Sequence, residues 1–196
     1  YPVVFISPTD TNLIYDNSDT RRKYLDSAIS QFNNVYLKTL ISYNKTLKQR
    51  NSLLKQFAFS NTFDEFTLST YNEVLVNYGK IIYLEREKYL SKLIPVFQKY
   101  YSEISSGKEE VSIEYQSQLK DNDFIDILES SIMKDRSSTR TSVGIHKDDL
   151  LFKLDNHSIK KHGSQGQQKS FLISLKLAQF EFMKEEFGLN PILLLD

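Results

Sequence analysis

The stretch HGSQGQQKSFLISLKLAQFEFMKEEFGLNPILLLD, residues 162–196, joins a glycine-flanked serine to a long apolar run and a short aliphatic segment. Ser164 and Gln167 have the spacing of a capping box, in which two side chains satisfy free amides at the start of a helix. The pattern predicts a helix over about residues 165–187, with Gly188 as its C-terminal stop. Because apolar residues occur on all sides of this helix, we expect it to be buried.

The start of this helix also has the features of an anion-binding site. The first-turn amides of a helix have no partners inside the helix and lie at the positive end of its dipole. Gly163 and Gly166 allow the backbone to approach a ligand closely, so the segment can hold a phosphate. From the residues alone, the alternative is a buried helix with an ordinary cap, since capping boxes are common.

The end of the stretch predicts a strand with an acid at its carboxyl end. Residues 192–195 are four aliphatic residues followed by Asp196, a pattern typical of a central parallel strand. Ligands of open α/β sheets bind at this edge, and an Asp there commonly holds Mg²⁺ beside a nucleotide phosphate. From the residues alone, Asp196 is a candidate for an acid linked to Mg²⁺, and the alternative is an ordinary buried strand that ends in Asp, which is common.

Two long helices are predicted in the middle of the chain. One begins near residue 33 and the other at the capping-box spacing of residues 62–65, and their apolar stripes predict an antiparallel pair. Pro95 is expected to kink the second of these helices or to end its first half. The narrow seam of the first helix is predicted to consist of Leu37, Leu40, Asn44, Leu47, Asn51 and Leu54.

Shorter elements complete the predicted plan, which is α+β with a mixed α/β part. A tight turn is expected at residues 155–157. Further helices are expected over about residues 18–32 and 124–133, and strands over residues 1–6, 111–115, 141–145, 150–154 and 158–161.

The composition limits the classes of function. Among 196 residues there are 25 basic and 25 acidic side chains, so the formal net charge is zero. Without a global positive field, any contact with nucleic acid has to come from a local patch. The chain has no cysteine, which excludes disulfides and cysteine zinc sites and fits a reducing cytosol. No apolar run is long enough to cross a membrane, and the histidines lack metal-ligand spacing.

Two groups of basic residues are candidates for contacts with DNA phosphates. Arg21 and Arg22 lie in the first turns of a predicted helix, and Lys45, Lys48 and Arg50 lie along the next helix. Lysine and arginine supply most phosphate contacts in protein–DNA interfaces. For both groups the alternative is an ordinary solvated helix face.

A family resemblance follows from four stretches taken together. The residues GSQGQQKSFLISLKLAQFEFMKEEFGLNPILLLD resemble the signature motif, signature helix and Walker B strand of an ABC-type ATPase. With FISPTDTNLIYDNSDTRRKYLD, YNKTLKQRNSLLK and GIHKDDLLFKL, they resemble more specifically the RecF family of bacterial recombination-repair proteins, which is related to the SMC ATPases. The resemblance covers essentially the whole chain in the same order.

The chain departs from the family pattern in two places. Residues 144–147 read Gly-Ile-His-Lys where the family usually has Gly-Pro-His-Arg, so the turn that the proline sets is in doubt. The Walker A pattern G-x-x-x-x-G-K-[ST] does not occur in these residues. In the family that loop precedes the segment matching this chain, so we expect an internal segment of a longer protein that does not hydrolyse ATP by itself.

The resemblance also implies a division into lobes and roles for individual residues. Residues 1–16 would lead out of the ATPase lobe, residues 17–137 would form the helical lobe, and residues 138–196 would be part of the ATPase lobe. A second acid with a role in catalysis would follow Asp196, which itself would hold Mg²⁺. Contacts to the γ-phosphate of ATP bound by another copy would come from Ser164, Gln165, Gly166, Gln167 and Gln168.

For the whole protein, the resemblance implies a cytoplasmic bacterial protein that binds ATP and Mg²⁺, forms an ATP-dependent homodimer and hydrolyses ATP slowly. It would bind gapped DNA or junctions between single-stranded and double-stranded DNA, and would act with RecR and RecO to load RecA. Two alternatives remain, namely a non-catalytic helical interaction module and another SMC-like ATPase.

Overall fold

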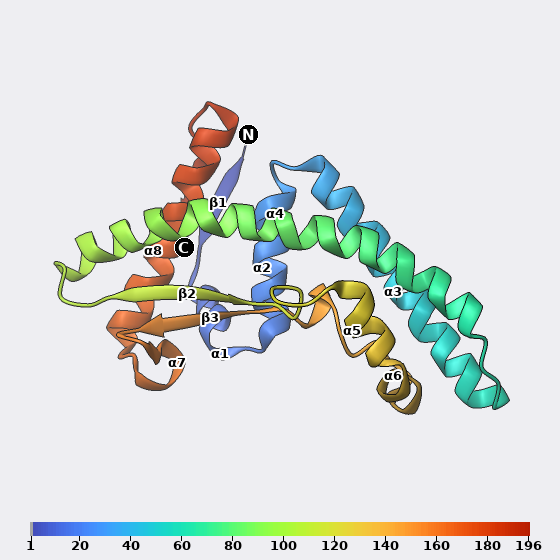
Figure 1. Ribbon diagram of the computed structural model, residues 1–196. Coiled ribbons are helices and arrows are strands. Elements are labelled where there is room, and N and C mark those ends of the chain that lie inside the picture. Colours follow the sequence, from blue (N-terminus) through green and yellow to red (C-terminus); the bar gives the residue numbers. More distant parts are fainter. Residues whose placement is uncertain (1) are drawn as a thin grey trace. The chain divides into compact units, whose positions relative to one another are not determined.

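A computed structural model describes residues 2–196, so the part of the first predicted strand at Tyr1 lies outside the described residues. The chain forms two compact units (Figure 1). The first consists of residues up to Phe32 together with Arg86–Gln116 and Asp149–Asp196, and the second consists of Asn33–Glu85 and Ser117–Asp148. The lobe boundaries expected at residues 17 and 138 concern the whole protein and stay a prediction.

The first unit contains two small sheets and the helices that pack against them. Strand β1 (Val3–Ile6) pairs in parallel with β5 (Ile192–Leu195), and the antiparallel sheet has the order β2-β3-β4. The other elements of this unit are η1 (Pro8–Thr11), α1 (Asn12–Tyr15), α2 (Ser18–Ser30), the C-terminal part of α4 (Glu65–Ser105), β2 (Val111–Gln116), β3 (Asp149–Leu154), β4 (His157–Ser158), α7 (Ile159–His162) and α8 (Gln165–Phe187).

Helix α8 is buried along most of its length, as the sequence predicts. Its apolar side chains belong to an aromatic core in which the Phe171 ring lies 4.7 Å from the Phe97 ring and 5.1 Å from the Phe152 ring, measured between centroids. The predicted stop is also confirmed, because Gly188 adopts the left-handed conformation (φ +64°) that favours glycine. Packing of α8 therefore fixes the position of its N-terminus.

The predicted turn after β3 is confirmed, but the returning strand is shorter than predicted. Asp155 and Asn156 both have positive φ, 46° and 63°, as a two-residue hairpin turn requires. The returning strand β4 ends at Ser158, and residues 159–162 form the short helix α7 instead. Ile159 is fully buried, and its entry into the core accounts for the change of direction.

The second unit is built on a pair of long helices, α3 (Asn34–Ser60) and the first part of α4, with α5 (Phe124–Ser130), α6 (Ile132–Ser138) and η2 (Ile145–Lys147). The predicted antiparallel pairing is confirmed by contacts at both ends. Asn33 donates to Glu85 (2.9 Å) near the start of α3, and Leu54 packs in one cluster with Leu68 near its end.

Helix α4 does not end at its proline. Pro95 lies inside the helix, which runs without a break from Glu65 to Ser105, so the predicted end of a first half is wrong. Proline removes the hydrogen bond to the carbonyl four residues earlier, and its ring crowds that carbonyl. Because Pro95 lies on the exposed side, that carbonyl can be hydrated and the helix continues.

Residues 141–145 are not a strand, contrary to the sequence-based expectation. Their polar groups bond to side chains of neighbouring helices, since Thr141 N donates to Asn51 Oδ1 (2.7 Å) and Ser142 N donates to Asp135 Oδ1 (2.9 Å). Gly144 has a φ of +117°, which an extended strand does not allow. Hydrogen bonds to side chains thus take the place of the backbone hydrogen bonds that a strand at residues 141–145 would make.

The buried row of α3 is displaced by one residue from the predicted seam. Leu37, Leu40, Leu47 and Asn51 are only half-buried, and Asn44 is exposed. The buried row consists of Tyr36, Thr39, Tyr43, Thr46, Arg50, Leu54 and Phe57. The apolar stripe therefore marked the edge of the interface, while polar side chains with specific partners occupy its centre.

Replacing Gly79 by alanine should destabilise the second unit, although alanine is the better helix former. A β-carbon at Gly79 in α4 would lie 2.4 Å from the Phe124 ring and 3.4 Å from Tyr43. Overpacking of this kind costs about 1–3 kcal/mol, which exceeds the roughly 1 kcal/mol gained from helix propensity. Urea denaturation measures the net loss, and an increase in stability would contradict the close packing. Gly188→Ala is no matched control because of its positive φ, whereas Ala58→Gly on the exposed side of α3 isolates the propensity effect.

Candidate phosphate-binding site

The N-terminus of α8 has the capping box that the sequence predicts. Gln167 N donates to Ser164 Oγ (3.2 Å), and Ser164 N donates to Gln167 Oε1 (2.6 Å). The amides of Gln165 and Gly166, the first two of the helix, have no hydrogen-bond partner among residues 2–196. Two outward amides and the positive end of a 23-residue helix thus face solvent at one place.

Side chains of the first unit hold this cap in place. Gln167 Nε2 donates to Glu109 Oε1 (2.7 Å), and the Tyr101 hydroxyl donates to the other oxygen of Glu109 (2.6 Å). Burial, together with the hydrogen bond to Glu109, raises the pKa of Tyr101 above its usual value, so the hydroxyl keeps its proton as a donor. Glu109 lies in the loop that follows α4, and this loop therefore orients the capping glutamine.

The side chain of Gln168 supports the loop that precedes α8 through hydrogen bonds. Its side chain is buried, with Nε2 donating to the carbonyls of Ile159 (3.2 Å) and Gly163 (3.1 Å) and Oε1 accepting from the Tyr15 hydroxyl (2.5 Å). Its amide is also used, because it donates to the Ser164 carbonyl. Among residues 164–168, Gln168 thus supports the loop, while Ser164, Gln165 and Gly166 are exposed.

The two glycines of the segment differ in what the surrounding structure demands of them. A β-carbon at Gly163 would lie 2.7 Å from the Ile159 side chain and carbonyl, so packing excludes a larger residue. A β-carbon at Gly166 would meet nothing closer than Ser164 Oγ at 3.9 Å. No packing contact therefore requires glycine at position 166, in contrast to position 163.

The charge around the helix start also suits an anion. The residues from His157 to Lys169 include no carboxylate, and the side chains of Lys160, Lys161 and Lys169 are exposed. Lys160 Nζ donates to the Tyr15 carbonyl (2.5 Å), which holds it on the loop. The exposed lysines add to the positive charge of the helix dipole, while Glu109, bonded to Gln167, places one carboxylate beside the cap.

Asp196 lies at the carboxyl end of β5, as predicted. Its amide donates to the Ile6 carbonyl (3.0 Å), which extends the parallel pairing with β1, and its side chain is exposed. Within the described residues β5 pairs with β1 alone, so its predicted central position in a sheet is not observed. One face of this two-stranded sheet is apolar and about half exposed, and it consists of Val3, Phe5, Ile192 and Leu194.

Contacts of Lys176 show which part of α8 packs against the strand pair that ends at Asp196. Lys176, near the middle of α8, donates to the Phe5 carbonyl (3.0 Å) and pairs with Asp10 (2.8 Å), and Phe5 lies beside Leu194 in β5. Lys176 follows Ser164 by 176 − 164 = 12 residues, about 18 Å along the helix axis. The middle of α8, and not its N-terminus, therefore lies against the strand pair that carries Asp196.

Three of the five basic candidates are engaged in contacts within the chain. Arg21 makes a two-pronged ion pair with Asp149 (2.6 and 2.9 Å), and Arg22 lies 3.6 Å from Asp19. Arg50 is fully buried, so its expected contact with DNA is wrong for a physical reason: its guanidinium has no accessible surface. Lys45 and Lys48 are exposed, as a contact with DNA requires.

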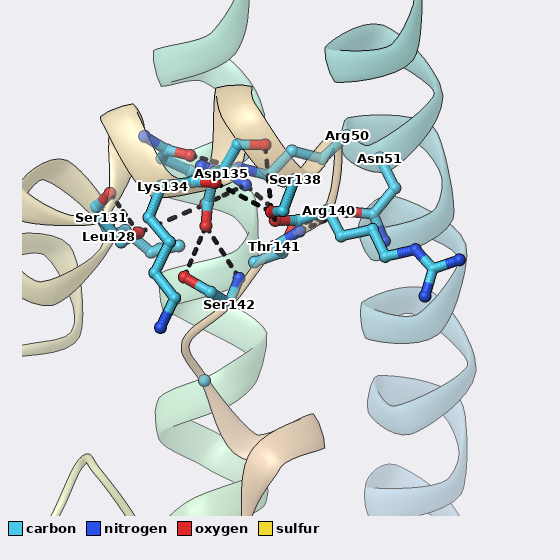
Figure 2. Close-up of polar contacts among 12 residues, drawn as sticks. Arg50, Asn51, Leu128, Ser131, Lys134, Asp135, Ser138, Arg140, Thr141 and Ser142 are labelled. Atoms are coloured by element: carbon cyan, nitrogen blue, oxygen red, sulfur yellow. Dashed lines mark hydrogen bonds and ion pairs between the residues drawn. The ribbon is translucent and has the colours of Figure 1, made fainter.

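The partners of Arg50 form a buried polar network that the sequence did not reveal (Figure 2). Arg50 Nη1 lies 2.8 Å from Asp135 Oδ2 and 2.8 Å from Thr141 Oγ1, and Nε donates to Asn72 Oδ1 (2.8 Å). Figure 2 shows Asp135 between Arg50 and Ser142, whose hydroxyl donates to its second oxygen (2.6 Å). The network ties α3, α4 and α6 to the segment after α6.

Within the described part of the chain there is neither a cluster of metal-binding side chains nor a membrane-spanning helix. Between Pro2 and Asp196 no three or more His, Asp or Glu side chains gather as they would around a metal ion. No helix in the same range is long and apolar enough to span a membrane.

The fold defines a class of protein: a helical lobe joined to part of an ABC-type ATPase lobe. No protein-family model matches the chain. Over its whole length, however, the chain is 53% identical to the DNA replication and repair protein RecF of Flavobacterium johnsoniae and 45% identical to that of Cytophaga hutchinsonii. The chain belongs to the RecF family.

Solved structures agree with this assignment. The structure described as the recombination mediator protein RecF-ATP in the RecFOR pathway matches 100% of the chain with a TM-score of 0.94 and 34% identity. A second structure, described as RecF-ATPrS in the same pathway, matches with a TM-score of 0.93 and 33% identity. The chain spans about half the length of these proteins, 54% of the Flavobacterium johnsoniae relative and 54% of the RecF-ATP chain.

Proposed function

We propose that residues 164–168 are the ATP sensor of a RecF-family ATPase, in which Ser164, Gln165 and Gly166 bind the γ-phosphate of ATP held by a second copy of the protein. Gln167 and Gln168 hold these three residues in place. The observation that carries this proposal is Gly166, whose missing side chain leaves two unpaired amides open to a ligand and serves no packing purpose. The two RecF structures whose descriptions name ATP and ATPrS support a nucleotide as the ligand.

The cap geometry allows phosphate binding without breaking the helix start. A serine hydroxyl has one proton to donate and two lone pairs to accept. Ser164 Oγ uses a lone pair for the Gln167 amide, and its proton has no acceptor among residues 2–196. Ser164 can therefore donate to a phosphate oxygen while it still caps α8, and the amides of Gln165 and Gly166 add two further donors.

Asp196 fits a role as one ligand of Mg²⁺. Its carboxylate is exposed at the carboxyl edge of a parallel pair of strands, and Mg²⁺ takes one or two carboxylates together with phosphate oxygens. When bound, Mg²⁺ would neutralise charge that develops on the phosphates during hydrolysis. Since Asp196 and Ser164 act on different phosphates in this proposal, each ATP needs groups from both copies, and ATP joins the dimer.

For the whole protein we propose the activities that the family resemblance implies. The protein is cytoplasmic, dimerises when it binds ATP with Mg²⁺, hydrolyses ATP slowly and binds gapped or junction DNA. The name RecFOR pathway, used for the matching structures, supports RecO and RecR as partners. In this proposal the protein acts with RecO and RecR to load RecA during replication restart and repair.

Asp196→Asn should lower Mg²⁺-dependent ATP hydrolysis by the full-length protein by at least about tenfold, because the amide loses the negative charge that Mg²⁺ prefers. Steady-state phosphate release measures the change. The matched control is Asp121→Asn, another exposed acid, which should keep the rate of the wild type. If the wild type neither hydrolyses ATP nor changes mass with ATP, the chain is instead part of a helical interaction module.

A further inference from the structure

The outer side of α3 carries a row of seven exposed residues, four of which are lysines. We propose that this row is the surface through which the protein binds the phosphate backbone of DNA, an inference that rests on the DNA binding in the proposed function and adds its location. We call it the α3 row, and it consists of Lys38, Ile41, Lys45, Lys48, Ser52, Lys55 and Phe59, all of them exposed.

The spacing places these residues on one side of the helix, opposite the packed side. Successive members are three or four residues apart, which keeps them in line on an α-helix. At about 100° per residue, the mean direction of the α3 row differs by about 170° from that of the buried row. Over the residues from Lys38 to Lys55, the four lysines extend for about 26 Å.

The charge of the row is not balanced by neighbours on the helix. Helix α3 has no acidic residue in its 27 positions, although the whole chain has as many acidic as basic residues. The only other basic residue of α3, Arg50, is buried and paired with Asp135. Lys38, Lys45, Lys48 and Lys55 make no ion pair with any described residue. A chain whose 196 residues carry no net charge thus concentrates four lysines without ion pairs on one side of α3.

DNA fits this surface better than a partner helix does. A helical partner needs a continuous apolar seam at positions with this spacing, but five of the seven members are polar. Lysine heads on flexible stems follow a line of phosphates without requiring a fixed geometry. A DNA strand presents one phosphate every 3.4 Å or so, which allows each of the four lysines to reach one.

The test uses the full-length protein and a fluorescent gapped duplex, with the binding constant measured across a series of KCl concentrations. Each phosphate contact contributes about 0.9 to the slope of log affinity against log salt. The quadruple variant Lys38→Gln, Lys45→Gln, Lys48→Gln and Lys55→Gln should therefore lose about 3–4 from this slope, and affinity at low salt should fall at least tenfold.

The matched control changes the net charge equally at exposed lysines outside the α3 row, in a variant with Lys88→Gln, Lys99→Gln, Lys108→Gln and Lys120→Gln. This control should keep most of the slope. If the wild type binds DNA and the α3 variant has an unchanged slope, the proposal is overturned. The α3 row would then be a surface for an acidic protein partner or an ordinary solvated helix face. ATP-driven dimerisation, measured in the same samples, separates this failure from failure of the ATP sensor.

Discussion

Arg50→Met should destabilise the helical unit by about 3–5 kcal/mol, because it leaves the Asp135 carboxylate buried without its cation. Neither side chain has any exposed surface, so water cannot replace the lost partner. The cost includes the hydrogen bonds that Arg50 makes to Asn72 and Thr141. Chemical denaturation of the full-length protein, followed by circular dichroism, should show the helical transition moved to much lower urea.

Three further variants give the measurement its meaning. Lys48→Met, on the exposed side of the same helix, should change stability by less than about 0.5 kcal/mol. Arg50→Met combined with Asp135→Leu should recover only part of the loss: it removes the unpaired buried charge, but Ser142 and Asn72 still lose their hydrogen-bond partners. Arg50→Lys should be intermediate, because it keeps the charge but lacks the fork that reaches several acceptors. A loss below about 1 kcal/mol in Arg50→Met would show that Asp135 finds another partner.

The same network explains which part of the fold could be predicted. The apolar spacing in α3 indicated a long helix with one packed side, and that much is correct. A hydropathy pattern predicts that an arginine is exposed. Arg50 is buried because it pairs with Asp135, which lies 85 positions away in the sequence, and a local pattern cannot show that pairing. The predicted seam of α3 was displaced by one residue, and residues 141–145 were wrongly predicted to form a strand. Both errors have the same cause, because the conformation of these residues depends on polar side chains whose partners are distant in the sequence.

The candidate site divides in a similar way. The helix, its cap and its stop depend on residues within a few positions of each other, so the spacing of Ser164, Gln167 and Gly188 was sufficient to predict them. Glu109 precedes Gln167 by 58 positions in a loop without a motif, and no local signal connects the two residues. The sequence likewise could not show that packing requires glycine at position 163 but not at position 166, because this difference depends on where Ile159 lies after folding.

Ser164→Arg should abolish ATP-driven dimerisation of the full-length protein while leaving ATP binding intact. The arginine side chain would fill the space above the exposed amides of Gln165 and Gly166 and remove the hydroxyl that donates to the phosphate. Its mass in solution should stay that of a monomer at ATP concentrations that double the mass of the wild type. Light scattering after size separation measures this, with a fluorescent ATP analogue to check binding.

Two controls separate phosphate sensing from helix capping. Ser164→Ala removes the cap at a cost of about 1 kcal/mol but adds no bulk, so it should weaken dimerisation only partly. Ser130→Arg places the same side chain at an exposed serine of α5 and should dimerise like the wild type. If Ser164→Arg dimerises normally with ATP, residues 164–168 act only as a helix cap, and the open surface at Gly166 then has no role in joining two copies. If instead it loses ATP binding as well, the arginine has disturbed the fold, and Ser164→Ala decides between the two roles through its effect on the mass alone.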